Sequence, residues 1–361
     1  MKQVMVTGGA GFVGANFIHW LQTEEPDVHV INVDVLNYAG TRANLDDLPD
    51  QSRHTFVQAD INEREKIEHL LVEHQVDTLV HFAAETHVDR SIAGAQSFIH
   101  TNVAGTLALL ETIRRVWQSP DGKWIEGVRF HHVSTDEVFG SLEPFDPPFN
   151  ERTSYDPRSP YAASKAAADH LVRAFGHTYK MPYSLTNCSN NYGPRQYPEK
   201  LVPLVILNAL AGLPLPIYGD GEQIRDWLYI DDHCQAIMTV LKHGQIGQTY
   251  HIGSNVQITN IELVKRICSL LDEFKPNSAY LPHEQLIQFV SDRPGHDQRY
   301  AMDTDKVNSQ LGWLPQVSLE EGLHHTIEWY LENPDWVDAI RVREDYQAWL
   351  ADHYGMGDIL Q

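Results

Sequence analysis

The N-terminal segment joins a short apolar strand to a helix through a loop of glycines. Residues 4–6 are apolar, glycines stand at Gly8, Gly11 and Gly14, and apolar residues then recur at helical spacing over 17–21. Bare backbone lets a pyrophosphate approach such a loop, and the helix N-terminus donates N–H groups to it. A tight strand-to-helix turn also favours glycine, so the motif alone leaves a purely structural explanation open. The segment predicts a βαβ unit that binds a dinucleotide.

A carboxylate follows the next strand at the spacing that this interpretation requires. The apolar run at 28–33 ends in Asp34, 20 residues after Gly14. A carboxylate there would hold the adenosine ribose hydroxyls and repel a 2′-phosphate, which favours NAD over NADP. Arg42 lies nearby in the sequence and weakens that preference.

Strands and helices alternate through the first half of the chain. Apolar runs at 54–59 and 77–82 end in Asp60 and in Ala83-Ala84, and helical patterns cover 63–73 and 95–116. This alternation indicates a doubly wound parallel sheet, whose ligands bind beyond the carboxyl ends of the strands. We therefore predict an α/β fold, Rossmann-like, with a smaller C-terminal substrate-binding lobe.

The predicted division of the chain falls near residue 190. Residues 1–190 form the NAD-binding domain, with some later segments returning to it, and 191–361 form mainly the substrate-binding lobe. The elements expected in the second lobe are a helix at 201–211, a strand at 227–230, a helix at 231–242, a strand at 249–252 and a helix at 260–271.

The apolar run at 128–133 ends in four polar residues, Ser134, Thr135, Asp136 and Glu137. In a ligand crevice, repulsion and desolvation separate the pKa values of adjacent carboxyls, leaving one protonated and one ionised. Such a pair serves as one acid and one base. The alternative is a helix N-cap or a solvated pair of surface acids.

Tyr161 and Lys165 stand four residues apart in an Ala-rich helical stretch that begins just after Pro160. The spacing places both side chains on one helix face. A neighbouring ammonium favours the phenolate, so we expect Lys165 to lower the pKa of Tyr161 and make it usable as a base. The same spacing is common by chance in helices. We interpret it as functional here because the glycine loop and the polar strand end occur in the same chain.

The composition excludes several classes of partner. Lys and Arg total 27 against 49 Asp and Glu, a formal charge of −22, which opposes binding to nucleic acid or to anionic membranes. No signal-peptide pattern occurs, and the most apolar later run, 201–217, contains three prolines, so we expect a soluble protein. The three cysteines have no metal-type spacing and the 20 histidines include no HExxH pattern, which predicts reduced thiols in a cytoplasmic protein and no catalytic metal.

Taken together, these motifs resemble a known family. The stretches that carry the resemblance are the glycine loop, 83–91, 134–140, 161–165, 187–194 and 225–227. They are similar to the extended short-chain dehydrogenase/reductases and, among these, to the dTDP-glucose 4,6-dehydratases, over about residues 1–350. The specific part is Thr135-Asp136-Glu137, because related sugar-nucleotide epimerases carry small or apolar residues at the two acidic positions.

The resemblance implies a homodimeric NAD-dependent lyase of deoxysugar biosynthesis that converts dTDP-glucose to its 4-keto-6-deoxy form and water. Tyr161, aided by Thr135 and Lys165, would take the proton of the 4-hydroxyl while the hydride at carbon 4 passes to NAD. Glu137 would then remove the hydrogen at carbon 5, Asp136 would protonate the departing 6-hydroxyl, and the hydride would return to carbon 6.

The resemblance also assigns residues to each ligand. The catalytic residues are Thr135, Asp136, Glu137, Tyr161 and Lys165. The residues expected to bind NAD are Gly8, Gly11, Phe12, Val13, Gly14, Asp34, Asn37, Asp60, Ile61, Ala83, Ala84, Thr101, Tyr161, Lys165 and Asn191. The residues expected to bind the nucleotide sugar are Thr86, Thr135, Asn190, Lys200, Leu201, Pro216, Tyr218, Arg225, Asn260, Arg293 and His296. The basic members of the last group supply the positive charge that a diphosphate needs in an acidic protein.

Some alternatives stay open. Residues 35–37 depart from the family, which usually has Lys and Thr around the adenosine, so the fine cofactor contacts are not determined. The same NAD site and Tyr161 would also suit a sugar-nucleotide 4-epimerase, and a non-catalytic NAD-binding regulator is a third possibility. The nucleotide base follows from the resemblance only, and UDP- or CDP-glucose are alternative substrates.

Overall fold

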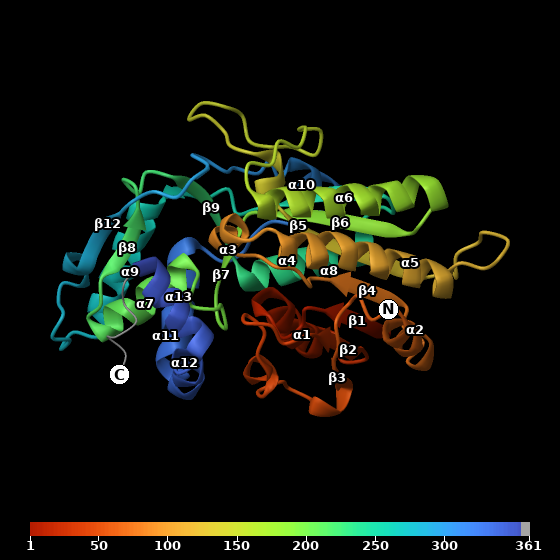
Figure 1. Cartoon of the computed structure of the whole chain (residues 1–361), viewed down its shortest axis with the longest axis horizontal. Coiled ribbons are helices and arrows are strands. Elements are labelled where there is room, and N and C mark those ends of the chain that lie inside the picture. The colour runs from red at the N-terminus through yellow and green to blue at the C-terminus, as the bar shows by residue number, and fades with distance from the viewer. Residues whose placement is uncertain (355–361) are drawn as a thin grey trace.

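The computed structural model describes residues 1–354, and the last residues of the expected second domain, 355–361, lie outside this part. A parallel sheet of seven strands forms the larger lobe, at the right in Figure 1. Its strands, in spatial order, are β10 (Gln248–Ile252), β6 (Tyr183–Cys188), β5 (Arg129–Thr135), β4 (Thr78–His81), β1 (Gln3–Thr7), β2 (His29–Asp34) and β3 (His54–Gln58). The strand order reverses direction at β1 and β4, so the sheet is doubly wound as predicted.

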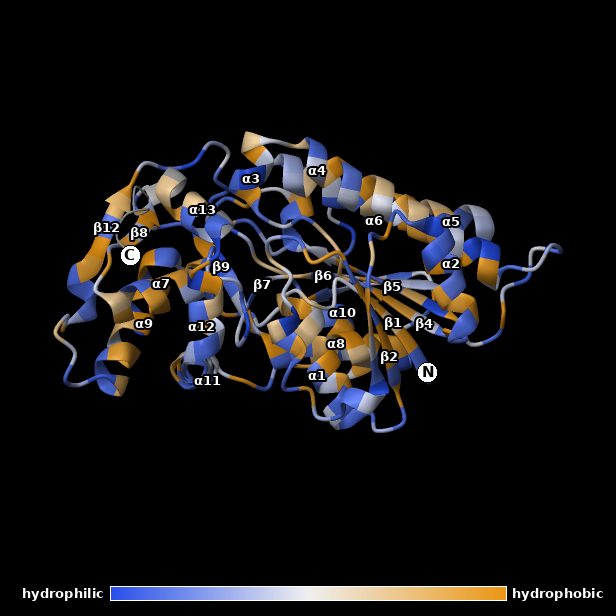
Figure 2. Ribbon diagram, turned by 60° about the horizontal axis from the view of Figure 1, so that its bottom comes forward, coloured by the Kyte–Doolittle hydropathy of each residue, from blue (hydrophilic) through white to orange (hydrophobic). Residues whose placement is uncertain are grey.

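Helices cover both faces of this sheet. On one face α2 (Arg64–Glu73) packs against α5 (Thr106–Trp117), and α5 against α6 (Pro160–Tyr179). On the other, α1 (Phe12–Glu24) packs against α8 (Ile230–His243), with α10 (Asp305–Leu311) beside β10. Because both faces are covered, most residues of the central strands are buried, and β1, β2 and β4 appear mostly orange between the helices in Figure 2.

The smaller lobe lies at the carboxyl edge of the sheet, at the left in Figure 1. It contains a three-stranded sheet of β11 (Gln257–Thr259), β9 (Ile224–Tyr229) and β7 (Asn190–Tyr192), and a parallel pair of β12 (Ile287–Val290) and β8 (Leu215–Tyr218). The helices of this lobe are α7 (Leu201–Ala211), α9 (Asn260–Phe274), α11 (Leu319–Glu332), α12 (Pro334–Arg341) and α13 (Glu344–Tyr354). Within residues 1–354, no helix is long and apolar enough to cross a membrane.

Short helical segments complete the chain between these elements. They are η1 (Arg42–Leu45), η2 (Gln51–Arg53), α3 (Val88–Ala93), α4 (Gln96–Phe98), η3 (Ile99–Gly105), η4 (Asp136–Phe139) and η5 (His283–Leu286).

Two elements that we expected in the second lobe lie in the first. Strand β10 pairs in parallel with β6 and extends the large sheet, and α8 packs against α1 on its face. The reason is that the outer edge of β6 presents unpaired backbone groups, which β10 satisfies, while the apolar face of α8 is buried against α1.

The helix expected at 95–116 is interrupted. The chain forms α4, then the π-helical segment η3, and then α5. Within η3 the Asn102 side chain accepts from the Glu85 N–H at 2.8 Å and donates to the Glu85 carbonyl at 3.0 Å. The irregular turn thus ties this helix to the loop after β4, as π segments near functional sites often do.

Gly14 of α1 packs tightly against backbone of the glycine loop, because a Cβ there would lie 2.3 Å from the Gly8 carbonyl oxygen. We predict that Gly14→Ala lowers the free energy of unfolding by about 1–3 kcal/mol, since backbone atoms must move apart. Urea unfolding monitored by circular dichroism measures the change. Gly94→Ala is the matched control, because nothing lies within 4 Å of its Cβ position. Equal destabilisation by the two substitutions would contradict the prediction.

Candidate active site

One large cavity opens at the carboxyl ends of β1 to β6, where the two lobes meet. Its lining contains all the residues expected to bind NAD and all five expected catalytic residues. Of the expected substrate-binding residues, it contains Thr86, Thr135, Asn190 and Lys200. The remaining seven do not line this cavity; they are Leu201, Pro216, Tyr218, Arg225, Asn260, Arg293 and His296.

The glycine loop forms the floor at one end of the cavity. Gly8 has a φ of +75°, and a Cβ on it would lie 2.6 Å from the Ala83 backbone nitrogen, so the loop touches the end of β4 directly. Helix α1 begins at Phe12, and its N-cap, Gly11, provides no side-chain hydrogen bond. The first N–H groups of α1 are therefore available to an anion, as a pyrophosphate requires.

Asp34, at the end of β2, anchors this loop. Its carboxylate oxygens accept hydrogen bonds from the Ala10 N–H at 2.9 Å and the Leu36 N–H at 2.8 Å. A carboxylate has about four acceptor positions, so two are left for ribose hydroxyls. Arg42 lies over the Phe56 ring at 4.9 Å and is not among the cavity residues, which removes the main argument for a 2′-phosphate.

Asp136 is buried at the end of β5, with 1% of its surface exposed. One carboxyl oxygen accepts from the Thr135 hydroxyl at 3.1 Å, and the other has no hydrogen-bond partner among the described residues. Burial, reinforced by the negative charges of Glu137 and Asp226, raises the pKa of Asp136 well above its usual range. These surroundings favour the protonated form of Asp136, which is the form that can act as an acid.

Glu137 has different charged neighbours from those of Asp136. Burial raises its pKa, but the positive charges of Arg293, Lys200 and Arg225 oppose that rise. Because these cations favour the carboxylate, Glu137 is the member of the pair that is more easily ionised. The two adjacent carboxyls thus differ in the direction that an acid and a base require.

The expected effect of Lys165 on Tyr161 is wrong for this structure. Burial, followed by Glu137, Cys188 and Asp136, raises the pKa of Tyr161 well above its usual value. Lys165 donates instead to the Val133 carbonyl at 2.8 Å, and burial lowers its own pKa. The prediction considered only the ammonium of Lys165. It did not include the nearby anionic groups or the burial of the phenol, both of which raise the pKa of Tyr161.

Four of the expected substrate residues outside the cavity have contacts that place them in the second lobe: Tyr218, Arg225, Arg293 and His296. Tyr218 donates to Asp89 at 3.2 Å, Arg293 forms an ion pair with Asp89 at 3.3 Å, and the His296 ring packs edge-on against Tyr218. Arg225 lies over the Tyr300 ring at 4.2 Å. Both arginines lower the pKa of Glu137, so these groups adjoin the catalytic carboxyls.

Several cavity residues were missed by sequence reasoning. They are Glu85, Cys188, Ser189, Gln196, Tyr197, Glu199 and His233, together with apolar neighbours of the assigned residues. Glu85, Cys188 and Ser189 follow or end strands β4 and β6, so their position at the carboxyl edge was a usable signal. Glu199 pairs with Arg90 at 3.3 Å across the two lobes, which only the folded chain reveals.

Comparison with known proteins gives a consistent result. The profile of the family described as GDP-mannose 4,6 dehydratase matches residues 5–326. The chain is 52% identical to a dTDP-glucose 4,6-dehydratase of Xanthomonas campestris pv. campestris (strain B100), over 94% of this chain and 96% of the relative. It is 49% identical to dTDP-glucose 4,6-dehydratase 1 of Escherichia coli (strain K12), over 98% and 99%.

A solved structure agrees with these relatives. The dTDP-glucose 4,6-dehydratase of Streptomyces venezuelae, determined with NAD bound, is 43% identical and superposes with a TM-score of 0.85. The match covers 94% of this chain and all of that one. The similarity thus extends over both lobes.

Asp226 in β9 offers a test of the electrostatics beside the site. Burial raises its pKa from 3.8 to about 6, although Ser254 hydrogen-bonds one oxygen. Between these two pH values the folded state binds more protons than the unfolded one, so stability falls as the pH rises. We predict that Asp226→Asn removes most of this loss, about 2 kcal/mol, at pH 7.5 relative to pH 4. Urea unfolding at both pH values measures the free energy of unfolding, and Glu222→Gln, at an exposed position, is the control. The same change in this free energy between the two pH values for wild type and Asp226→Asn would count against the prediction.

Proposed function

The chain belongs to the GDP-mannose 4,6 dehydratase family, and we propose that it is a dTDP-glucose 4,6-dehydratase, an NAD-dependent hydro-lyase. The reaction converts dTDP-glucose to dTDP-4-keto-6-deoxyglucose and water. The observation that carries the proposal is the pair of adjacent buried carboxyls, Asp136 and Glu137, at the end of β5, with pKa values separated by their surroundings.

The residues of the cavity fit NAD. The close contact of Gly8 with Ala83 and the uncapped N-terminus of α1 suit a pyrophosphate, and Asp34 suits the adenosine ribose. When bound, NAD would accept the hydride of carbon 4 and return it to carbon 6, and in its oxidised form it would carry a positive charge on the nicotinamide ring. That charge would oppose the carboxylates that raise the pKa of Tyr161.

We assign the first proton transfer to Tyr161. Its hydroxyl lies in the cavity with Thr135, whose hydrogen bond lowers the pKa of Tyr161 and opposes the effect of burial. Lys165, one helical turn later, is fixed by the Val133 carbonyl and adds a positive charge. In this assignment Tyr161 takes the proton of the sugar 4-hydroxyl, and Thr135 orients that hydroxyl.

We assign the elimination to the carboxyl pair. A ketone at carbon 4 acidifies the hydrogen on carbon 5, and Glu137 takes this proton as the base. Asp136 gives its proton to the departing 6-hydroxyl, which leaves as water. The two transfers are possible near one pH because Asp136 holds its proton more tightly than Glu137 does.

The proposed contacts to the substrate come mainly from the second lobe. We propose that Lys200, Arg225 and Arg293 bind the diphosphate, since they provide positive charge beside Glu137 in an acidic chain. Asn190 and Asn191 each have a buried side-chain oxygen without a partner among the described residues, which suits contacts to the sugar and the cofactor. The other expected substrate residues, Thr86, Leu201, Pro216, Tyr218, Asn260 and His296, complete this proposal.

We also propose a domain boundary near residue 190, a cytoplasmic location and a homodimer, as expected for the family. The three cysteines are free, which suits a reducing compartment. Light scattering on the purified protein tests the dimer.

Incubation with dTDP-glucose tests the function. We predict that the purified protein, without added reductant, produces a sugar that has lost one water and carries a new methyl group beside a 4-ketone. Mass spectrometry and proton NMR detect both changes. UDP-glucose and CDP-glucose serve as parallel substrates that test the nucleotide base.

Two other outcomes would contradict the proposal. A carbon 4 epimer with its 6-hydroxyl intact indicates an epimerase. Unchanged sugars with NAD still bound indicate a regulator.

The carboxyl pair allows a matched test of roles. We predict that Glu137→Gln slows exchange of the carbon 5 hydrogen with heavy water by about 10²–10⁴-fold, because the amide cannot accept that proton. Asp136→Asn, its isosteric neighbour, slows the loss of water but leaves the exchange in place. Deuterium incorporation followed by NMR separates the two steps, and normal exchange in Glu137→Gln would refute its assignment as the base.

A further inference from the structure

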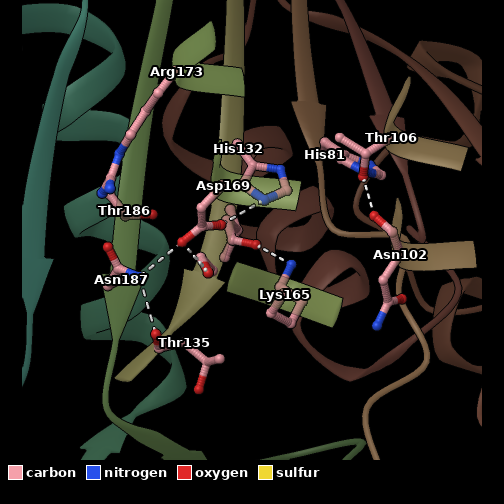
Figure 3. Close-up of polar contacts among 12 residues, drawn as sticks. His81, Asn102, Thr106, His132, Thr135, Lys165, Asp169, Arg173, Thr186 and Asn187 are labelled. Carbon is pink, nitrogen blue, oxygen red and sulfur yellow. Dashed lines mark hydrogen bonds and ion pairs between the residues drawn. The ribbon is translucent and has the colours of Figure 1, made fainter. Parts of the chain in front are cut away.

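A second buried carboxylate lies beneath the site. Asp169 is on α6, one turn after Lys165, has no exposed surface and is not among the residues that line the cavity. It therefore touches neither substrate nor cofactor. Figure 3 shows it between α6 and the strands β5 and β6, directed toward His132 and Asn187.

The contacts of Asp169 are those of an anion. One oxygen accepts from Tyr155 at 2.7 Å, Ser134 at 2.9 Å and the Asn187 amide at 3.3 Å. The other lies 3.1 Å from Nε2 of His132. Although burial opposes ionisation, His132, Lys165 and Tyr155 outweigh it and lower the pKa of Asp169.

These contacts hold the end of β5, the strand that carries the catalytic triplet. Ser134 donates directly to Asp169, and Asn187, which also donates to Asp169, binds the Thr135 carbonyl at 3.0 Å. Lys165 donates to the carbonyl of the preceding residue, Val133, at 2.8 Å. Lys165 and Asp169 thus hold Val133 and Ser134 directly, and Asp169 holds Thr135 through Asn187. Figure 3 shows the contacts from Asp169 to Asn187 and from Asn187 to Thr135.

Asp169 is also the anion that faces Lys165. The other titratable groups around Lys165 are Tyr161 on the same helix, His81 on β4, His132 on β5 and Cys188 on β6. Burial lowers the pKa of His81 well below its usual value and that of His132 to about 4, and it raises the pKa of Cys188 to about 12. The two imidazoles and the thiol are therefore neutral at neutral pH, and burial also raises the pKa of Tyr161. Asp169 alone among them carries a negative charge that favours the ammonium.

We propose that Asp169 is a positioning residue of the dehydration: its buried carboxylate fixes the end of β5 and keeps Lys165 cationic one turn from Tyr161. The proposal rests on the proposed function for its kinetic consequences. It adds a role for a residue that does not contact the reacting sugar. Because a lysine buried without a counter-charge tends to lose its proton, the carboxylate has an electrostatic effect beyond its hydrogen bonds.

Asp169→Asn tests this role because it keeps the shape and removes the charge. We expect kcat to fall about 10²-fold with the KM for dTDP-glucose changed less than about threefold. We also expect the alkaline limb of the kcat profile to move about one pH unit lower, since Lys165 loses its proton more easily. Tyr155→Phe is the matched control, because it removes one hydrogen bond to the same oxygen and leaves the charge, so the alkaline limb should not move.

Three results would overturn the proposal. The first is an Asp169→Asn profile whose alkaline limb coincides with that of the wild type, which would mean a purely structural role. The second is a rise in KM with kcat unchanged. The third is an equal shift of the alkaline limb in Tyr155→Phe.

A measurement on the wild type depends neither on the folding of Asp169→Asn nor on the proposed substrate. NMR of protein labelled with ¹³C,¹⁵N-lysine, with the Lys165 signal assigned by its loss in Lys165→Met, reports the protonation of Lys165 directly. A protonated Lys165 at pH 7.5 supports the proposal and a neutral one overturns it. This result holds even if dTDP-glucose proves not to be the substrate, so the two proposals fail separately.

Discussion

Charged groups buried at the carboxyl end of β5 constrain one another, and the rest of the site depends on this. An ammonium or a carboxylate removed from water needs a partner of opposite charge or several hydrogen bonds. Lys165 has a backbone carbonyl and Asp169, Asp169 has three donors and His132, and Glu137 has a surrounding set of cations. Asp136 accepts a hydrogen bond from one donor, Thr135, and the opposing effect of Arg225 is smaller than that of burial, so the pKa of Asp136 rises well above its usual range.

The two lobes contribute different parts of this balance. The large sheet supplies the carboxyls, the phenol and the ammonium, because β5 and α6 end and begin at the same edge. The smaller lobe supplies Lys200, Arg225 and Arg293, which favour ionised Glu137. Asp136 and Glu137 stand next to each other in the chain, and the cations of the second lobe oppose the rise in the pKa of Glu137 more than they oppose the rise in that of Asp136.

Tyr161 shows that a sequence motif can predict the position of a side chain without predicting its pKa. The Tyr161–Lys165 spacing placed both groups in the cavity, as a helix must. It did not predict the pKa of Tyr161, because the carboxyls and the thiol that raise it come from β5 and β6. A charge effect of this kind sums over neighbours that are distant in sequence, and the motif contains only one of them.

The sequence by itself determined the doubly wound sheet and the glycine loop at its edge, since these follow from local periodicity and from backbone that excludes side chains. It also indicated an acid and a base at Asp136 and Glu137. Only the tertiary structure placed β10 in the large sheet, joined Arg293 to Asp89 across the lobes and brought Asp169 under the end of β5. These features depend on contacts between segments that are far apart in the chain. Burial in the folded state determines which charged groups must pair, and a local sequence pattern does not contain that information.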